Sequence, residues 1–573
     1  MTKILSKKYK LYIMKHRIMK SISQFQFQKF IFTILLLLAF NSLIAQQKPS
    51  WQWAKGISGY SYVFTPIGVT ASALGNSFVT GSFNNTITID TVTISGCGHS
   101  IFIAKFDSSG NLAWARTAIN DPNSSCQNNA FSVKTDIAEN VYISGDFLGT
   151  ISFGSDTLTS KGDRDIFIAK YDPNGVFQWA KSVGGLGKDD FTWDGMEVDK
   201  NSNVFITGGC GRIQSSPTVP IIGTTVFDTT SITGFGSSDI FIASYDKDGN
   251  LRWVKLIGSK ASDVGITMGI DSSGSIYVGG SFGDTVYFDN FQLTGGGFFI
   301  AKYDNLGNAM WAKAIGGTVY VGPIMDADPH GNVYITGGSL GGIIDFGQFI
   351  LNIPFKSFLA KYDTHGNLMW ANPINIETPF LGISTDISGP VYLGGKFSNS
   401  YVSGSDTLKS NGGFDCLLLK YDTNGNEIWA LQAGGGSSDV CDALYMSPSG
   451  NLYAAGFFVG AINFGNILLQ GSTNVHNLFI AKLSQTTDLL NESFQTNSLQ
   501  IFPNPTSGIV NIHCTDRSYS TAKLFDQLGR EVLSQQLKEK QTSIHVDHLA
   551  DGVYYLQLWD NNSSLTQKIV IQH

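Results

Sequence analysis

The stretch Ile166–Lys181 reads IFIAKYDPNGVFQWAK, and close copies of it begin at Ile101, Ile240, Phe299, Phe358 and Leu418. In each copy an alternating apolar run is followed by Asp-x-x-Gly and then by a segment that contains Trp. Alternation with a period of two indicates a β-strand. Asp-x-x-Gly suits a tight turn, because the Asp side chain accepts backbone N–H bonds and Gly can adopt a positive φ. The stretch therefore predicts a repeated β-hairpin.

A second hairpin alternates with the first. Clear copies are Thr135–Gly145 (TDIAENVYISG), Ile270–Gly280 (IDSSGSIYVGG) and Ala327–Gly338 (ADPHGNVYITGG), and seven occur in all. The two hairpins together form a unit of four strands, which we call a, b, c and d, about 60 residues long. Four-stranded units repeated four to eight times around an axis are typical of a β-propeller.

The number of blades follows from the ends of the repeat region. Seven Trp residues occupy strand d: Trp53, Trp114, Trp179, Trp253, Trp311, Trp370 and Trp429. Trp53 precedes every strand a, whereas the last strand c, at Leu478, has no strand d after it. Pairing the first strand with the last blade completes seven blades and removes an open sheet edge. The sequence therefore predicts a seven-bladed β-propeller with velcro closure.

The first 45 residues differ from the rest. Eight Lys or Arg and no acid precede the apolar run Phe30–Ala45, a pattern typical of a secretory signal peptide. A membrane anchor is the alternative, although the run is short for a bilayer span. Without these residues Lys plus Arg falls from 38 to 30 against 45 Asp plus Glu, a net charge of about −15. We therefore expect no nucleic acid partner, and membrane contact only through the signal peptide or surface attachment.

Two resemblances extend this interpretation. Trp51–Leu483 resembles the seven-bladed propeller repeats of bacterial exported proteins. After a polar linker (484–498), the segments FPNPTSG, LFDQLGREV, LADGVYYLQL and KIVI appear in order within residues 499–573. They resemble the type A C-terminal sorting domain of the type IX secretion system, which implies a small Ig-like β-sandwich. It also implies export through the periplasm by that machinery, with a tail that is removed. The alternative for the tail is a carbohydrate-binding sandwich.

The sequence offers little catalytic chemistry. The propeller region has four His: His99, His330, His365 and His476. Asp189, Asp190 and Asp194 could include a carboxylate pair, but Asp263 and Asp439 occupy related positions and favour a repeated structural role. Asp246–Asn250 resembles a calcium loop but lacks the downstream Glu, so we interpret it as a turn. We predict no catalytic residues, no metal site and no cofactor, and the ligand-binding residues stay unknown.

Cysteine placement permits two disulfides. Cys97 lies in the b–c connection of the first repeat and Cys126 in the following d–a connection, and those two connections emerge on the same face of a propeller. Cys416 opens strand c of the sixth repeat, and Cys441 follows strand d by a similar offset. We predict Cys97–Cys126 and Cys416–Cys441 as pairs, with Cys210 and Cys514 unpaired. The alternative is that all six are small buried apolar residues.

These observations predict an exported, surface-attached or secreted binding or adhesion module without catalysis of its own. Variable long connections on a rigid scaffold are the usual binding place, so we expect a glycan or protein ligand on the long-connection face. The alternatives are an extracellular propeller enzyme acting on polysaccharide and a structural surface-layer component.

Overall fold

The computed structural model shows an all-β chain in two compact units, residues 1–487 and 488–573. The described residues are 48–573 except 62–66, 122–126, 213–222, 355, 474, 485–498, 503–505, 515–520, 527–529, 538–540, 560–563 and 573. The predicted signal peptide and most of the predicted linker lie outside them. The described residues form no helix, so none of them provides an apolar helix that could cross a bilayer.

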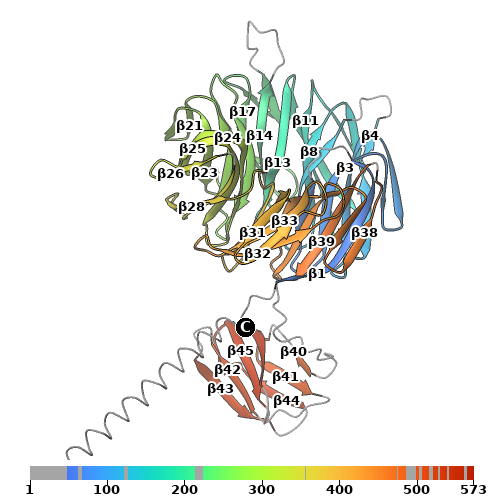
Figure 1. The fold of residues 1–573 in the computed structure, drawn as a ribbon, viewed down its shortest axis with the longest axis vertical. Coiled ribbons are helices and arrows are strands. Elements are labelled where there is room, and N and C mark those ends of the chain that lie inside the picture. The colour runs from blue at the N-terminus through green and yellow to red at the C-terminus, as the bar shows by residue number, and fades with distance from the viewer. Residues whose placement is uncertain are drawn as a thin grey trace, which may run out of the picture. The chain divides into compact units, whose positions relative to one another are not determined.

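Backbone pairing groups the propeller strands into seven four-stranded antiparallel sets (Figure 1). The first three sets begin with the strands nearest the axis and end at the outside. They are β2 (Gly68–Ala71), β3 (Ser77–Ile89), β4 (Val92–Phe106) and β5 (Leu112–Thr117); β7 (Asn129–Thr135), β8 (Val141–Phe147), β11 (Asp165–Tyr171) and β12 (Phe177–Gly185); and β13 (Lys188–Val198), β14 (Val204–Arg212), β17 (Asp239–Tyr245) and β18 (Leu251–Ile257).

The fourth and fifth sets share one long strand, β24 (Ala309–Ala327), whose first half is strand d of one blade and whose second half is strand a of the next. Their other strands are β19 (Val264–Ile270), β20 (Ile276–Phe282) and β23 (Gly297–Tyr303); and β25 (Val333–Asp345), β27 (Ser357–Tyr362) and β28 (Leu368–Ile374). The sixth set is β29 (Gly382–Thr385), β30 (Val391–Phe397), β33 (Asp415–Tyr421) and β34 (Glu427–Ala433).

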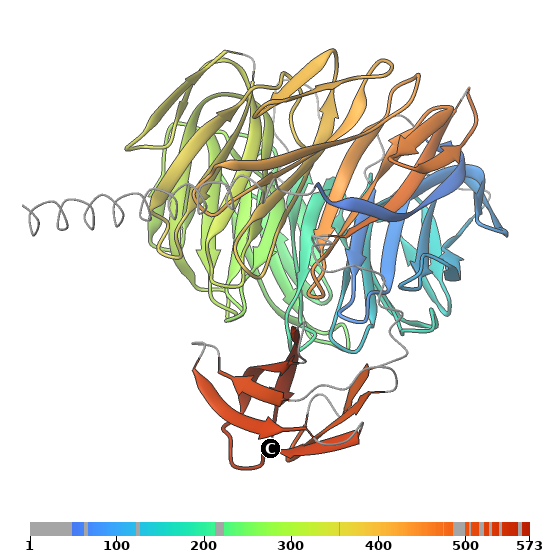
Figure 2. The ribbon, with the colours of Figure 1, turned by 60° about the horizontal axis from the view of Figure 1, so that its bottom comes forward.

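The seventh set joins the two ends of the propeller. It consists of β35 (Val440–Met446), β36 (Asn451–Phe458), β39 (His476–Ser484) and the first strand of the chain, β1 (Ser50–Ser61). Trp53 is opposite Lys482 and Ile57 is opposite Leu478, so the predicted velcro pairing is confirmed. In Figure 2 the blue strand β1 lies among the orange strands of this blade.

The connection between strands b and c folds back on itself in every blade. In five blades it forms a separate hairpin, and in the first and fifth it extends the long strands β3, β4 and β25, the last paired with β26 (Ile350–Ile353). The separate hairpins are β9 (Thr150–Phe153) with β10 (Asp156–Thr159), β15 (Thr224–Phe227) with β16 (Thr230–Thr233), β21 (Val286–Phe288) with β22 (Phe291–Leu293), β31 (Ser400–Ser403) with β32 (Asp406–Lys409), and β37 (Ala461–Phe464) with β38 (Ile467–Gln470). A short strand, β6 (Ile119–Asn120), pairs with β9.

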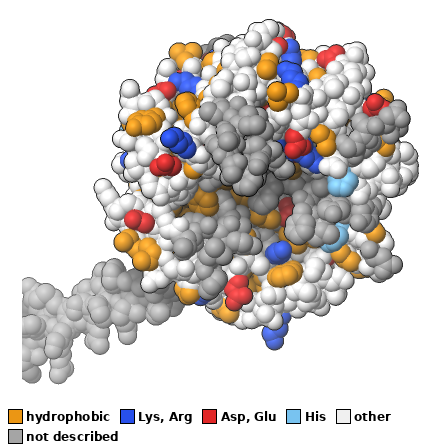
Figure 3. All heavy atoms as spheres, turned by 90° about the horizontal axis from the view of Figure 1, so that it is seen from above, with side chains coloured by type: hydrophobic (Ala, Val, Ile, Leu, Met, Phe, Trp, Pro, Cys, Tyr) orange, Lys and Arg blue, Asp and Glu red, His pale blue; other side chains and the backbone are white. Residues whose placement is uncertain are grey.

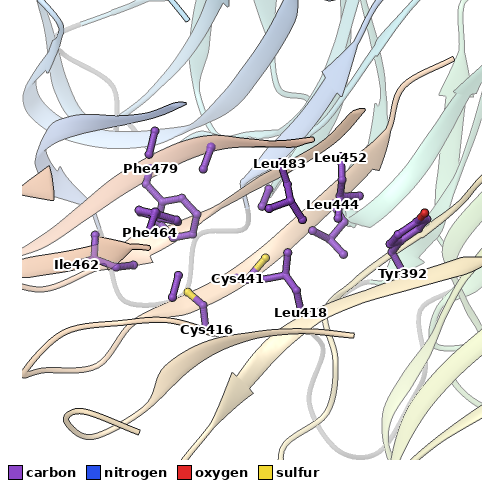
Figure 4. Close-up of a cluster of buried hydrophobic side chains, with 14 of the residues drawn as sticks. Tyr392, Cys416, Leu418, Cys441, Leu444, Leu452, Ile462, Phe464, Phe479 and Leu483 are labelled. Carbon is purple, nitrogen blue, oxygen red and sulfur yellow. The ribbon is translucent and has the colours of Figure 1, made fainter. Parts of the chain in front are cut away.

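The predicted disulfide Cys416–Cys441 is wrong. Both residues are free thiols with no exposed surface, inside strands β33 and β35 of neighbouring blades. Figure 4 shows their side chains among Leu418, Leu444 and Phe464 in the apolar core. Burial raises the pKa of both thiols, so the thiolate needed for disulfide chemistry is suppressed. The two cysteines serve as small apolar residues there.

Cys97 is disulfide-bonded. Its predicted partner, Cys126, lies outside the described residues, so this pairing stays a prediction. Cys210 is a free, buried cysteine, as predicted.

The second unit is a small sandwich. One sheet has the order β40 (Leu499–Phe502), β41 (Ile509–Cys514) and β44 (Gln541–His545), and the other has β43 (Glu531–Gln536), β42 (Thr521–Phe525), β45 (Gly552–Trp559) and β46 (Ser564–Ile571). Val510 and Ile544 of the first sheet share one core with Leu524, Leu556 and Ile569 of the second. Alternation of apolar residues along each strand produces this shared face.

Candidate functional site

The innermost strands of the propeller enclose a central cavity of about 830 Å³. Strand a of every blade contributes to its wall, for example Val69, Lys134, Glu197, Thr267, Asp326, Ser384 and Tyr445. The residues at one end are in the short a–b turns, such as Pro329, and those at the other end are in the longer connections, such as Thr378. The cavity is therefore a channel along the propeller axis. Figure 3 looks onto one face of the propeller, whose centre is hollowed and shows hydrophobic and acidic side chains.

A charged cluster lies near the short-turn end of this channel. The Lys134 ammonium is 2.7 Å from Glu197 Oε1 and 3.2 Å from Asp194 Oδ1. Burial would lower the pKa of Lys134, but Asp194 and Glu197 outweigh this effect and raise it. Burial raises the pKa of Glu197, opposed by Lys134. The arrangement is a buried ion pair with a second carboxylate on the same ammonium.

Asp326 completes this cluster from the opposite wall. Its Oδ2 accepts hydrogen bonds from the Thr385 backbone N–H at 2.8 Å and from the Thr385 hydroxyl at 3.0 Å. Its Oδ1 accepts the Ala327 N–H at 2.8 Å. Burial nevertheless raises the pKa of Asp326, and Lys134 partly offsets that rise.

The long-connection end of the channel has a different character. Lys396 Nζ lies 4.8 Å from the centre of the Phe414 ring, a cation–π contact. Asp442 lies nearby, and burial raises its pKa to about 7 against the opposing effect of Lys396. His476 packs edge-on against Phe457 at a centroid distance of 4.9 Å. This end can therefore present aromatic faces, an ammonium and a carboxyl to a ligand.

The structure separates the acids that the sequence grouped after GGLG. Asp189 is fully buried and accepts hydrogen bonds from the N–H groups of Gly185 and Gly211, both at 2.9 Å. Asp263 accepts the Ser259 N–H at 2.6 Å, and Asp439 accepts the Gly435 N–H at 2.7 Å. These three acids fix the start of strand a in their blades, which confirms the repeated structural role. Asp194 instead lines the channel.

Other residues singled out from the sequence lie in turns or in the wall of the channel. His330 and His365 lie in turns, and the His365 side chain is 80% exposed. His476 lines the channel. Asp246 Oδ1 accepts hydrogen bonds from the backbone N–H groups of Asp248 and Asn250, both at 2.9 Å, so this side chain stabilises a tight turn. Among the described residues, no group of three His, Cys, Asp or Glu is placed to hold a metal ion.

Lys134, Glu197 and Asp326 were not predicted from the sequence as a set, and neither was Asp442 at the other end of the channel. Lys134, Glu197 and Asp326 stand two residues before the a–b turn, where other copies of the repeat carry Gly269 or Ser384, and Asp442 stands earlier in its own strand a. A charged residue in an otherwise apolar or small-residue strand was the available signal. Nothing in the spacing shows that strands from different blades bring these residues together.

Residues 500–572 match the secretion system C-terminal sorting domain family. This match covers the second unit and confirms the predicted type IX sorting domain. The chain is therefore an exported protein, secreted or on the cell surface.

The chain is similar to a curated repeat protein and to solved β-propeller structures. An uncharacterised WD repeat-containing protein of Acanthamoeba polyphaga mimivirus is 24% identical over 464 residues, which is 66% of this chain. The chain spans about a third (32%) of that relative's length. Among solved structures, the β-propeller domain of Myceliophthora thermophila Cps50 (Swd1) has 10% identity and a TM-score of 0.35, with 75% of this chain and 99% of that one covered.

A second similar structure is PorZ of Porphyromonas gingivalis, described as an essential surface component of the type IX secretion system. It has 10% identity and a TM-score of 0.25, with 90% of this chain and 82% of that one covered.

Proposed function

We propose that the chain is an exported, surface-attached or secreted binding module without catalysis of its own, and that its ligand enters the central channel. The observation that carries this proposal is the cavity of about 830 Å³, to which strand a of every blade contributes. Mostly apolar walls with a few convergent polar groups are typical of ligand sites. A carbohydrate or polypeptide outside the cell is the class of ligand that such a module would meet.

The hydrogen bonding of the channel supports a binding role. Both oxygens of Asp326 accept bonds from the backbone or from Thr385, and Lys134 is held by Asp194 and Glu197. Groups held by such partners are fixed in position and can therefore orient a ligand.

The type IX sorting domain supplies the route to the outside. We propose that the secretion machinery recognises the second unit, takes the chain from the periplasm across the outer membrane and removes the tail there. A chain that ends at Ser484 retains all seven sets of strands, so it should fold and accumulate in the periplasm. Normal amounts of this truncated chain outside the cell would contradict the sorting role.

One observation favours an extracellular polysaccharide enzyme as a second candidate. Burial raises the pKa of Glu197 and of Asp442 to about 7 in this channel, and a carboxyl with a raised pKa can act as the general acid in glycoside hydrolysis. A glycan array separates the two candidates: a binding module retains an intact glycan, whereas an enzyme releases shorter sugars that mass spectrometry detects.

A separate experiment tests whether the ligand binds inside the channel. Ile266 lines the channel, so Ile266→Trp should obstruct it and abolish capture of any array ligand. Ile343→Trp, in the outer extension of β25 at a side chain that is 51% exposed, is the matched control and should bind like the wild type. Equal capture by both variants would place the ligand elsewhere on the propeller.

A further inference from the structure

The short-turn end of the channel has an excess of negative charge. Asp194, Glu197 and Asp326, which we call the acidic station, surround the single ammonium of Lys134. Of the described residues that line the channel, only Lys134, Lys396 and His476 carry or can carry a positive charge, and Lys396 is near Phe414 and Asp442. One ammonium therefore faces three carboxyls.

This imbalance is costly because Lys134 and Glu197 are largely withdrawn from water, with side chains that are 14% and 12% exposed. Burial raises the pKa of Glu197 and of Asp326, and the carboxylates of Asp194 and Asp326 raise that of Glu197 further, so the cluster around Lys134 has a deficit of positive charge. A cation that entered the channel beside the acidic station would relieve it. Because no group of three potential ligands is placed to hold a metal among the described residues, an organic cation suits the station better than a metal ion.

The mouth of the channel at this end is apolar. Pro329, Ile387 and Pro448 line it, and each is the second residue of an a–b turn. Ile387 is 66% exposed, and Ile137, at the same turn position of the second blade, is 91% exposed. Leu74, the third residue of the first blade's turn, is 74% exposed. Exposed apolar side chains gathered around an opening mark an interaction site.

We infer that the short-turn end of the channel binds a lysine or arginine side chain presented by an extracellular polypeptide, whose apolar neighbours cover the rim of Pro329, Ile387 and Pro448. The charge complementarity comes from the acidic station and the apolar contact comes from the rim. A free amine would contact only the acidic station, and a neutral peptide would contact only the rim. This inference rests on the proposed function, because it names the ligand class for the same channel.

The test uses the mature full-length chain and two peptides that differ by one ammonium. Acetyl-Leu-Ala-Lys-Ala-Leu-amide carries the cation, and its counterpart has norleucine in place of lysine. Calorimetry should give about tenfold tighter binding for the lysine peptide at low ionic strength. The double variant Asp194→Asn, Glu197→Gln should reduce that ratio to about one. n-Butylammonium should bind more weakly than the lysine peptide.

A matched control keeps surface charge constant. Asp248→Asn removes a carboxylate from an exposed c–d turn, where the side chain is 64% exposed, and should leave the ratio unchanged. Equal affinity for the two peptides, a preference that survives the double variant, or no heat with either peptide or with about 100 mM n-butylammonium would overturn the inference. n-Butylammonium that binds as tightly as the peptide would overturn the role of the rim.

The outcome is distinguishable from failure of the proposed function. If an array glycan is captured and Ile266→Trp abolishes the capture, the channel is a binding site, whatever the peptides do. Absence of a cation preference would then reject only the ligand class named here.

Discussion

Trp114 of one blade donates its indole N–H to the carbonyl of Pro173 in the next blade, at 3.0 Å. The relationship recurs around the ring: six of the seven strand-d Trp residues bond a carbonyl in a neighbouring c–d turn. In each case the indole also covers the turn glycine, so that a Cβ on Gly175 would lie 2.7 Å from Trp114 Cδ2. The Asp-x-x-Gly turn therefore has a second role, as the docking place for the preceding blade.

Gly175→Ala should destabilise the propeller for two reasons, one in its backbone conformation and one in its side-chain packing. The residue has a φ of 73°, and its new methyl group would collide with Trp114. We expect a loss of about 2–4 kcal/mol in the free energy of unfolding, measured by urea denaturation followed by tryptophan fluorescence.

Gly274→Ala is the matched control for this prediction. Gly274 has a similar φ, 86°, but no atom lies within 4 Å of the position that a Cβ would take. Gly274→Ala should lower the free energy of unfolding only by the cost of the strained backbone, about 1–2 kcal/mol. Equal losses at the two positions would show that the contact with Trp114 contributes nothing.

The sequence predicted the propeller because its signals are local. The Asp172 turn, the alternating strand Asp165–Tyr171 and the Trp179 strand lie within about 20 residues of one another, and their spacing determines a hairpin. The channel cluster could not be predicted in this way. Lys134 and Glu197 meet only because two strands from different blades face the same axis, and no local pattern specifies that meeting.

The disulfide prediction failed for a related reason. The sequence pattern places Cys416 at the start of strand c and Cys441 just after strand d, which predicts that the two meet across the rim of one blade. The residues are instead inside strands that face an interblade core, where side chains are packed as apolar groups. Whether a position lies in a strand or just beyond it is a difference of one or two residues, which pattern alone does not resolve.

Deletion of Trp51–Gly59 should open the ring. These residues pair with β39 on one side and with the end of β3 on the other, and Ile57 is fully buried between them. Without them the last blade has an unpaired edge. We expect a large fall in the melting temperature and concentration-dependent aggregation, measured by calorimetry and light scattering.

Removal of the second unit after Ser484 is the control for that deletion. It leaves β39 paired with both neighbours, so the propeller transition should stay where it is. An unchanged melting temperature after loss of Trp51–Gly59 would show that β1 is dispensable for closure.

The cysteines should differ in reactivity. Cys210, Cys416 and Cys441 are buried thiols, so in the native protein they should resist an alkylating reagent and react only after unfolding. Peptide mapping without reduction should find Cys97 joined to Cys126, a link that contributes roughly 3 kcal/mol if unstrained. A linked Cys416–Cys441 peptide from native protein would contradict the assignment of both as thiols.

Stability should fall as the pH rises from about 4 to about 7. Burial raises the pKa of Asp165 to about 7, of Asp239 to about 6 and of Asp439 to about 7. The folded state therefore holds protons that the unfolded state has released above about pH 4, so each pH increment in this window favours unfolding. We expect a melting temperature several degrees higher at pH 5 than at pH 8 in equal salt.

The variant Asp165→Asn isolates one of these carboxyls. Asp165 Oδ2 accepts the Lys161 N–H at 3.1 Å, whereas its buried Oδ1 has no hydrogen-bond partner. An amide keeps one acceptor and cannot ionise, so this variant should melt at or above the wild-type temperature at pH 8 and show a shallower pH dependence. Asp189→Asn is its counterpart: Oδ1 accepts the Gly211 N–H and the Thr225 hydroxyl while Oδ2 accepts the Gly185 N–H, so an amide must lose an acceptor. It should destabilise the fold at every pH, and the same loss from Asp165→Asn would show that the Asp165 carboxylate is stabilising.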